Sequence, residues 1–193
     1  PRLLGLGLQN IPPALGCLRP LPERGAAWST RISSLPAPRI GLVWRTGGGG
    51  RDPRPQLPLA RLAPLIRYRA GSFLAFNAED RRDEIVAAGL AGHIIDLGAE
   101  FAETPGGPWA EMLAALDCID LLIAVDSPAA HLAGLLGRPA WLLLAQPADW
   151  RWFCGRADSP WYPTVRLMRQ SSAGDWASVV EAAARRLAGE DAA

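Results

Sequence analysis

Short, uninterrupted apolar runs alternate along the chain with segments of helical periodicity, and this alternation limits the fold more than any other feature. The runs occupy residues 39–44, 72–76, 93–97, 119–125, 140–145 and 165–168. Strands of a parallel sheet are buried on both faces and read as continuous apolar runs, whereas half-exposed strands alternate apolar with polar residues. The pattern predicts an α/β fold, a Rossmann-like parallel sheet with helices on both faces.

The segments between and after these runs have the spacing of amphipathic helices. They occupy residues 57–66, 80–88, 108–116 and 129–136, with one more helix after Asp175. In this last helix Asp175 is the expected N-cap. One face of the helix carries Trp176, Val179, Val180, Ala183 and Leu187.

The sequence predicts one domain with two short appendages. Residues 1–38 are rich in proline and glycine, contain one helical stretch at 25–35, and are expected to form a linker or an N-terminal extension from a missing domain. Residues 39–189 form the predicted Rossmann-like domain, and residues 190–193 are a tail.

Composition and charge exclude several classes of protein. With 49% hydrophobic residues and 20 basic against 19 acidic side chains, the chain is neither disordered nor a dedicated nucleic-acid binder. Three separate cysteines and two histidines predict no metal site. The longest apolar run, 140–145, is too short to span a bilayer, and the start of the chain lacks a secretory signal, so we expect a cytoplasmic protein.

The sharpest candidate site follows the run at 119–125. Asp126 and Ser127 come directly after the strand, Ser127 is placed to cap the next helix, and Pro128 falls at its first position. The amide groups of that first turn favour an anion such as phosphate, and His131 lies one turn further on. The alternative is an ordinary strand–turn–helix in which Asp126 and Ser127 only cap.

A second candidate is the glycine-rich loop after the first strand, comprising Trp44, Arg45, Thr46 and Gly47 and continuing to Arg51. Glycines allow the backbone to approach a ligand closely, and the arginines and Thr46 are suited to phosphate. The alternative is a flexible glycine loop. Neither the dinucleotide fingerprint nor the P-loop is present.

Three further polar residues follow strands and are expected at the same crevice, because ligands of parallel sheets bind beyond the carboxyl ends of the strands. Asn77 is suited to a base or ribose, and Gln146 and Asp149 follow the run at 140–145. Asp80 is expected to cap the next helix. The aromatic loop 150–163 is expected to fold onto the domain, with one indole as an alternative floor for a base.

Taken together these motifs resemble a specific family. Residues 115–134, 137–139, 149–152, 158–163 and 174–176, with the strand 40–44 and the segment 57–60, are similar to the C-terminal domain of bacterial tetratricopeptide-repeat proteins that carry a glycosyltransferase family 9 (heptosyltransferase-like) module. The resemblance implies the C-terminal half of a GT-B fold. In that fold this half binds a nucleotide-diphosphate sugar, the donor substrate, without metal or other cofactor.

Carried over by residue, the resemblance puts Asp126, Ser127 and His131 at the diphosphate and ribose of the donor. Residues 44–47 then line the first loop, and Asn77 stands where related chains often have Gln. The sequence departs from the family at Arg45-Thr-Gly-Gly-Gly-Gly50, where related chains often have Ala-Gly-Asn, and at Ser127-Pro128, where Thr or Ser followed by Gly or Ala is common.

The resulting hypothesis is the donor-binding half of an inverting, metal-independent glycosyltransferase. No catalytic residue is expected in this chain, except that His131 is a candidate for stabilising the leaving group. The base and the acceptor site would come from a missing N-terminal Rossmann domain, with helical repeats as a further part of the parent protein. The alternative is a degenerate, non-catalytic domain that serves as a scaffold or interaction module. An NAD-type oxidoreductase is disfavoured because the dinucleotide fingerprint is absent.

Overall fold

A computed structural model describes Gly5, Gly7 and residues 10–45, 56–68, 71–105 and 107–189. The described part of the chain contains one six-stranded sheet with the order β3-β2-β1-β4-β5-β6, and every pair of neighbouring strands is parallel. The strands are β1 (Arg39–Val43), β2 (Ser72–Ala75), β3 (Ile94–Asp96), β4 (Leu121–Val125), β5 (Ala140–Leu144) and β6 (Val165–Arg169). The predicted α/β fold is confirmed, and each predicted apolar run corresponds to one strand, with β6 one residue longer than its run.

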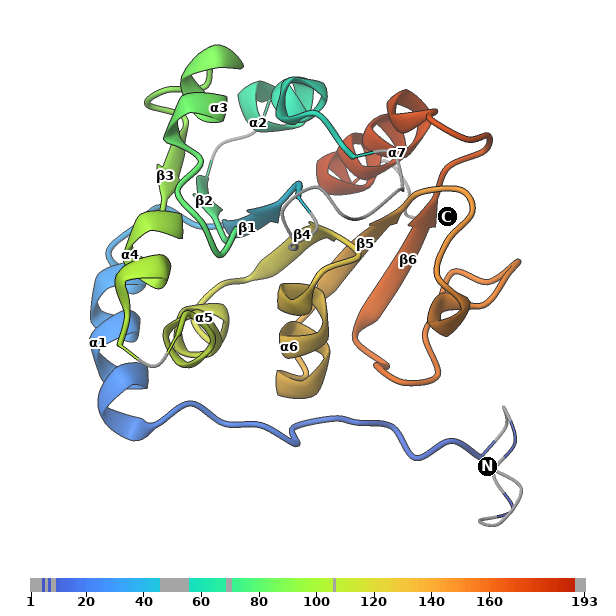
Figure 1. Ribbon diagram of the computed structural model, residues 1–193, viewed down its shortest axis with the longest axis horizontal. Helices are drawn as coiled ribbons and strands as arrows, with labels where there is room; N and C mark the ends of the chain where they lie inside the picture. Colours follow the sequence, from blue (N-terminus) through green and yellow to red (C-terminus); the bar gives the residue numbers. More distant parts are fainter. Residues whose placement is uncertain are drawn as a thin grey trace.

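Helices cover both faces of this sheet (Figure 1). One layer consists of α1 (Pro22–Ser33), α4 (Gly98–Glu103), α5 (Trp109–Leu116) and α6 (Pro128–Leu136). The other consists of the 3-10 turn η2 (Leu59–Leu62) with α2 (Ala63–Tyr68), α3 (Arg82–Ala87) and α7 (Trp176–Ala188). The four inner strands are buried almost throughout, as two covering layers require, whereas the edge strands β3 and β6 are partly exposed.

The segment before β1 packs on the sheet domain. In α1, Trp28 and Ile32 are buried, and the indole nitrogen of Trp28 donates to Glu111 of α5 at 2.6 Å. Arg24 forms an ion pair with the same carboxylate. The backbone ahead of α1 also bonds to the domain, since the amide of Cys17 donates to the carbonyl of Leu135 at 2.9 Å. The proposed boundary at residues 38 and 39 remains a prediction, and the tail 190–193 lies outside the described residues.

Two elements were not predicted, namely α4 and the 3-10 turn η3 (Trp150–Trp152). The start of α4 is fixed by tertiary contacts: the amide of Gly98 donates to Asp96 at 2.9 Å. A Cβ at Gly98 would lie 2.1 Å from the carbonyl oxygen of Glu79, so only glycine fits against the loop that follows β2. None of the described helices has the length and apolar composition needed to cross a membrane.

Candidate functional site

The strand order changes direction between β1 and β4, and this point defines where a ligand is expected. The next described helices after β1, η2 and α2, lie on one face of the sheet, and α6, which follows β4, lies on the other face (Figure 1). At such a reversal a ligand site is expected beyond the carboxyl ends of the two strands, and we call this position the crevice. A small cavity of about 40 Å³ lies there, and its lining includes Arg45, Asn77, Arg81, Trp109 and Ser127.

Ser127 occupies the N-cap position of α6, but the expected capping bond is not formed. Its side chain accepts no bond from the first turn, and its buried Oγ has no hydrogen-bond partner among the described residues. The amide of Ala130 donates to the carbonyl oxygen of Ser127 at 3.1 Å, so the donor that a capping hydroxyl normally satisfies is already bonded. Pro128 is at the first helical position as predicted. Ser127 thus contributes an unsatisfied hydroxyl to the crevice.

Two more polar groups at the same cavity lack partners within the described part of the chain. The Nδ2 atom of Asn77, a residue only 4% exposed, and the Nε atom of Arg81 make no hydrogen bond. The Oδ1 atom of Asn77 accepts from the amide of Arg45 at 3.3 Å and so joins the loops after β1 and β2. Unpaired buried polar groups are uncommon and costly, so three around one cavity require an explanation.

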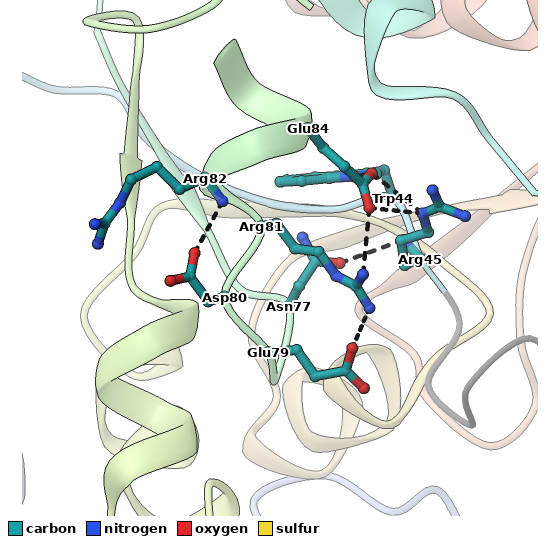
Figure 2. A network of polar contacts seen from close by, with 8 residues as sticks. All are labelled: Trp44, Arg45, Asn77, Glu79, Asp80, Arg81, Arg82 and Glu84. Carbon is teal, nitrogen blue, oxygen red and sulfur yellow. Dashed lines mark hydrogen bonds and ion pairs between the residues drawn. The ribbon is translucent and has the colours of Figure 1, made fainter. Parts of the chain in front are cut away.

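Glu84 of α3 holds both arginines of the crevice (Figure 2). Its carboxylate accepts from Nε of Arg45 at 3.1 Å and from Nη1 of Arg81 at 3.2 Å. It also accepts from the indole nitrogen of Trp44 at 2.8 Å. Burial alone would raise the pKa of Glu84, but the hydrogen bonds from Trp44 and Arg45 and the charges of Arg45 and Arg81 bring that pKa below its usual value.

This network corrects the prediction that Trp44 lines the ligand site at the first loop. The ring of Trp44 is fully buried, so its side chain belongs to the core and does not line the crevice. The amphipathic spacing of the helix at 80–88 predicts that its charged residues are solvated, yet Glu84 and Arg81 are half-buried. The N-cap position of α3 is Arg81 and not Asp80 as expected, but the Asp80 carboxylate accepts from the amide of Arg82, the first helical residue, at 2.9 Å. Thr46 and Gly47 lie outside the described residues.

His131 is held one turn into α6 by three side chains. Its Nδ1 lies 2.9 Å from the hydroxyl of Tyr162, and its ring stacks on Trp152 with 5.2 Å between centroids. Its Nε2 lies 3.9 Å from the Asp126 carboxylate. Burial lowers the pKa of His131, although the charge of Asp126 opposes this.

The aromatic loop therefore acts in the way the sequence indicated, by folding onto the domain, and it also fixes the candidate histidine. Trp152 is 1% exposed, and Tyr162 packs so closely on α6 that a Cβ at Gly134 would lie 2.4 Å from its ring. No local sequence pattern predicts the Tyr162–His131 contact, because the two residues come from separate elements.

The last two predicted residues lie further along the sheet. The Asp149 carboxylate accepts from the amide of Arg151 at 3.0 Å and caps η3. The amide of Gln146 donates to Gln170 at 3.1 Å, and Gln146 borders a separate cavity. The structure thus brings Arg45, Asn77 and Ser127 to one cavity, with Asp126 and His131 beside it. Within the described residues, no three His, Cys, Asp or Glu side chains are grouped to hold a metal ion.

Comparisons with known proteins agree with this fold. No family model matches the sequence. Protein FlbA of Caulobacter vibrioides is 27% identical over 165 residues, which are 82% of this chain but only 26% of FlbA.

Two solved structures have a similar fold. The E. coli ADP-heptose LPS heptosyltransferase II matches over 90% of this chain and 54% of its own, with a TM-score of 0.60 and 17% identity. A family 9 glycosyltransferase from Veillonella parvula matches over 79% of this chain and 42% of its own, with a TM-score of 0.55 and 19% identity. The chain spans about half of these proteins or less, and it has the glycosyltransferase-like α/β fold that they contain.

Proposed function

We propose that this chain is the donor-binding half of an inverting, metal-independent glycosyltransferase that uses a nucleotide-diphosphate sugar. The observation that carries the proposal is the cluster of unpartnered polar groups from Asn77, Arg81 and Ser127 around the start of α6. Each of these groups can donate a hydrogen bond, and a diphosphate offers only acceptors.

The start of α6 adds a favourable electrostatic field. A helix N-terminus carries a partial positive charge, and an anion placed there gains about 0.3–1 kcal/mol, or more when partly buried. The same charge would stabilise the nucleoside diphosphate as it leaves the anomeric carbon of the sugar. A metal would not be needed if Arg45 and Arg81 left the Glu84 carboxylate and paired with the diphosphate in its place.

His131 and Asp126 complete the proposed site. The Asp126 carboxylate is a suitable acceptor for a ribose hydroxyl. His131 is fixed by Tyr162 and Trp152, so its position near the diphosphate would be maintained without help from the ligand. As a stabiliser of the leaving group it would act as a hydrogen-bond donor in its neutral form, because its pKa is lowered by burial.

The remaining parts of the enzyme are proposed to lie outside this chain. An N-terminal Rossmann domain would supply the acceptor site and the catalytic base, and the parent protein would be a cytoplasmic bacterial protein with tetratricopeptide repeats. The two similar structures support a second domain in the parent, because this chain covers 54% and 42% of them.

Titration of tryptophan fluorescence with ADP, UDP and GDP tests the proposal. Trp109 borders the crevice and is partly exposed, so a bound nucleotide should quench it. We expect saturable quenching by one nucleotide and its loss in Asp126→Ala. His131→Ala is expected to abolish binding as well, with the fold of both variants checked by circular dichroism. Equal affinity for that nucleotide in wild type and both variants would remove the site assignment.

A non-catalytic module is the second candidate, and one observation favours it. The cavity at the crevice holds only about 40 Å³, and both of its arginines are already paired with Glu84. A degenerate domain would retain such a closed site and bind no nucleotide. Absence of quenching by all three nucleotides, both in this chain and in the full-length protein, would favour this alternative.

A further inference from the structure

A second and larger cavity lies beyond the carboxyl ends of β5 and β6. Its volume is about 340 Å³, within the range of small-molecule sites. Its walls come from the segments that follow the two strands and from residues 153–155. It shares no lining residue with the cavity at the start of α6. Ligands of parallel sheets bind on this side of the strands, so the position is suitable for a ligand.

One wall of this cavity carries a half-buried cation without a carboxylate. The guanidinium of Arg169 donates from Nε to the carbonyl oxygen of Arg156 at 3.0 Å and from Nη2 to that of Trp152. No described carboxylate forms an ion pair with it, whereas the neighbouring Arg156 pairs with Asp158 at 2.5 Å. Burial lowers the pKa of Arg169. Partly buried charges are normally paired, so this guanidinium lacks its usual anionic partner.

Next to Arg169, Gln170 contributes an amide that is only half satisfied. The residue is 4% exposed, and its Oε1 accepts from the amides of Gln146 at 3.1 Å and Gly174 at 3.0 Å. These two bonds fix the orientation of the side-chain amide. Its Nε2 then has no hydrogen-bond partner in the described part of the chain. The two adjacent residues thus present donor groups whose complement is an oxygen acceptor.

The rest of the lining is apolar or neutral. Pro147, Ala148 and Phe153 form the apolar part, and no aspartate or glutamate occurs among the described residues that line the cavity. Because the lining has one positive charge and no negative charge, it is complementary to a ligand with a single negative charge. The apolar wall is complementary to a hydrophobic body of that ligand. A guanidinium binds a carboxylate well, because two parallel N–H···O bonds fit its geometry.

We propose that this cavity is a second ligand site, which binds a small molecule composed of one carboxylate on an apolar body. The carboxylate pairs with Arg169 and accepts from Nε2 of Gln170, and the body lies against Phe153 and Pro147. The site does not depend on the nucleotide-sugar proposal, since none of its residues belongs to the crevice at β1 and β4.

Cys154 lines the cavity and is exposed, which makes its thiol a reporter for occupancy. The experiment uses the whole chain with Cys17→Ser, because Cys17 is also exposed, whereas Cys118 is half-buried with a pKa raised by burial. The alkylation rate of Cys154 by iodoacetamide is measured by mass spectrometry with sodium benzoate as the probe. Benzamide, which has the same shape without the charge, is the matched ligand.

We expect benzoate to slow alkylation saturably, by about tenfold at ten times its dissociation constant, because only the empty site reacts. Benzamide should leave the rate unchanged. No protection by benzoate at any soluble concentration, or equal protection by benzamide, would overturn the proposal.

Gln170→Glu tests the polar contacts. Glutamate keeps an oxygen to accept from the two backbone amides, but it replaces the unpartnered Nε2 with a second oxygen and supplies Arg169 with a carboxylate. Protection by benzoate should be lost in this variant and retained in Ala177→Glu, which adds the same charge at an exposed position of α7. Protection that survives in Gln170→Glu would exclude the proposed contacts.

Discussion

The hydroxyl of Tyr162 lies 2.9 Å from Nδ1 of His131, a hydrogen-bond distance at which the hydroxyl is able either to donate or to accept. Burial raises the pKa of Tyr162, so its hydroxyl stays protonated and can donate to Nδ1. The Asp126 carboxylate lies 3.9 Å from Nε2 and favours a proton there. The neutral histidine therefore presents Nε2–H on the side of Asp126, where the donor substrate is proposed to bind.

The first prediction concerns the pH dependence of stability. His131 has a folded-state pKa below its ordinary 6.5, so between these two values the unfolded chain binds more protons than the folded one. The free energy of unfolding should therefore fall as the pH is lowered through 6.5 toward the folded pKa, and this contribution should then level off. Urea unfolding of wild type and His131→Asn at about pH 7 and about pH 5 measures it. The wild type should lose more stability than the variant.

His93 provides the matched control for this prediction, because it is exposed. His93→Asn should keep the pH dependence of the wild type. If His131→Asn also keeps it, burial of His131 is not its source. The pKa itself can be read from the imidazole proton resonances.

The second prediction reverses the usual effect of removing an N-cap residue. Ser127→Ala deletes a buried hydroxyl that has no partner among the described residues, so it should raise the free energy of unfolding by about 1 kcal/mol. Loss of a side chain that does cap a helix lowers the free energy of unfolding by a similar amount. Nucleotide affinity should fall at the same time. Asp175→Ala is the control: Asp175 accepts from the amide of Ser178 at 3.1 Å, so its loss should destabilise the protein. Ser127→Ala that behaves like Asp175→Ala would mean that Ser127 caps α6 in solution.

The third prediction tests whether the Glu84 carboxylate competes with the nucleotide for Arg45 and Arg81. Glu84→Gln keeps an acceptor for the indole of Trp44 but removes the negative charge that holds Arg45 and Arg81. The variant should be less stable at neutral pH, because the carboxylate has a lowered pKa and is favoured by folding. It should also bind the nucleotide more tightly, by several-fold in isothermal titration.

Glu79→Gln is the comparison for this variant, since Glu79 is mostly exposed and contacts only Arg81 within the network. It should change nucleotide affinity less than Glu84→Gln does. Weaker binding in Glu84→Gln would indicate that these arginines do not contact the diphosphate.

The fourth prediction tests how closely the aromatic loop packs. In Gly134→Ala the new Cβ would lie 2.4 Å from the ring of Tyr162, which should cost about 1–3 kcal/mol of stability by overpacking. Thermal unfolding of the single and double variants with Tyr162→Ala forms a double-mutant cycle. The two changes should be strongly non-additive, because removal of the ring also removes the clash; additive effects would contradict the close packing.

The strands and most helices could be predicted from the sequence because each has a local signal. The run at 119–125 is apolar enough for burial on both faces, and Pro128 followed by alanines is typical of a helix start. By contrast, α4 depends on Gly98 fitting against the loop after β2, a contact between distant residues. The sequence places Ser127 correctly at the N-cap position, but its hydroxyl does not cap α6. The amide of Ala130 bonds to the backbone carbonyl of Ser127 instead.

The candidate site was predictable only as a set of loops. Parallel topology places Asn77 and Ser127 at one edge of the sheet, and the structure places both at one cavity. The partners of these residues were not predictable. Glu84 has the same spacing as a solvated helix residue, and nothing local distinguishes Tyr162 from the other aromatic residues of its loop.

The docking of α1 determines what can serve as a hinge. Because Trp28 is buried and Glu111 binds both Trp28 and Arg24, the twelve-residue helix moves as one body with α5. Residues 34–38 cannot then act as a hinge between α1 and the sheet, although their proline content is typical of a linker. Any rotation of a preceding domain relative to the crevice would have its pivot upstream of α1. The contacts of Trp28 and Arg24 with Glu111 would thus decide where the chain can bend, whatever the proline content of the segment after α1.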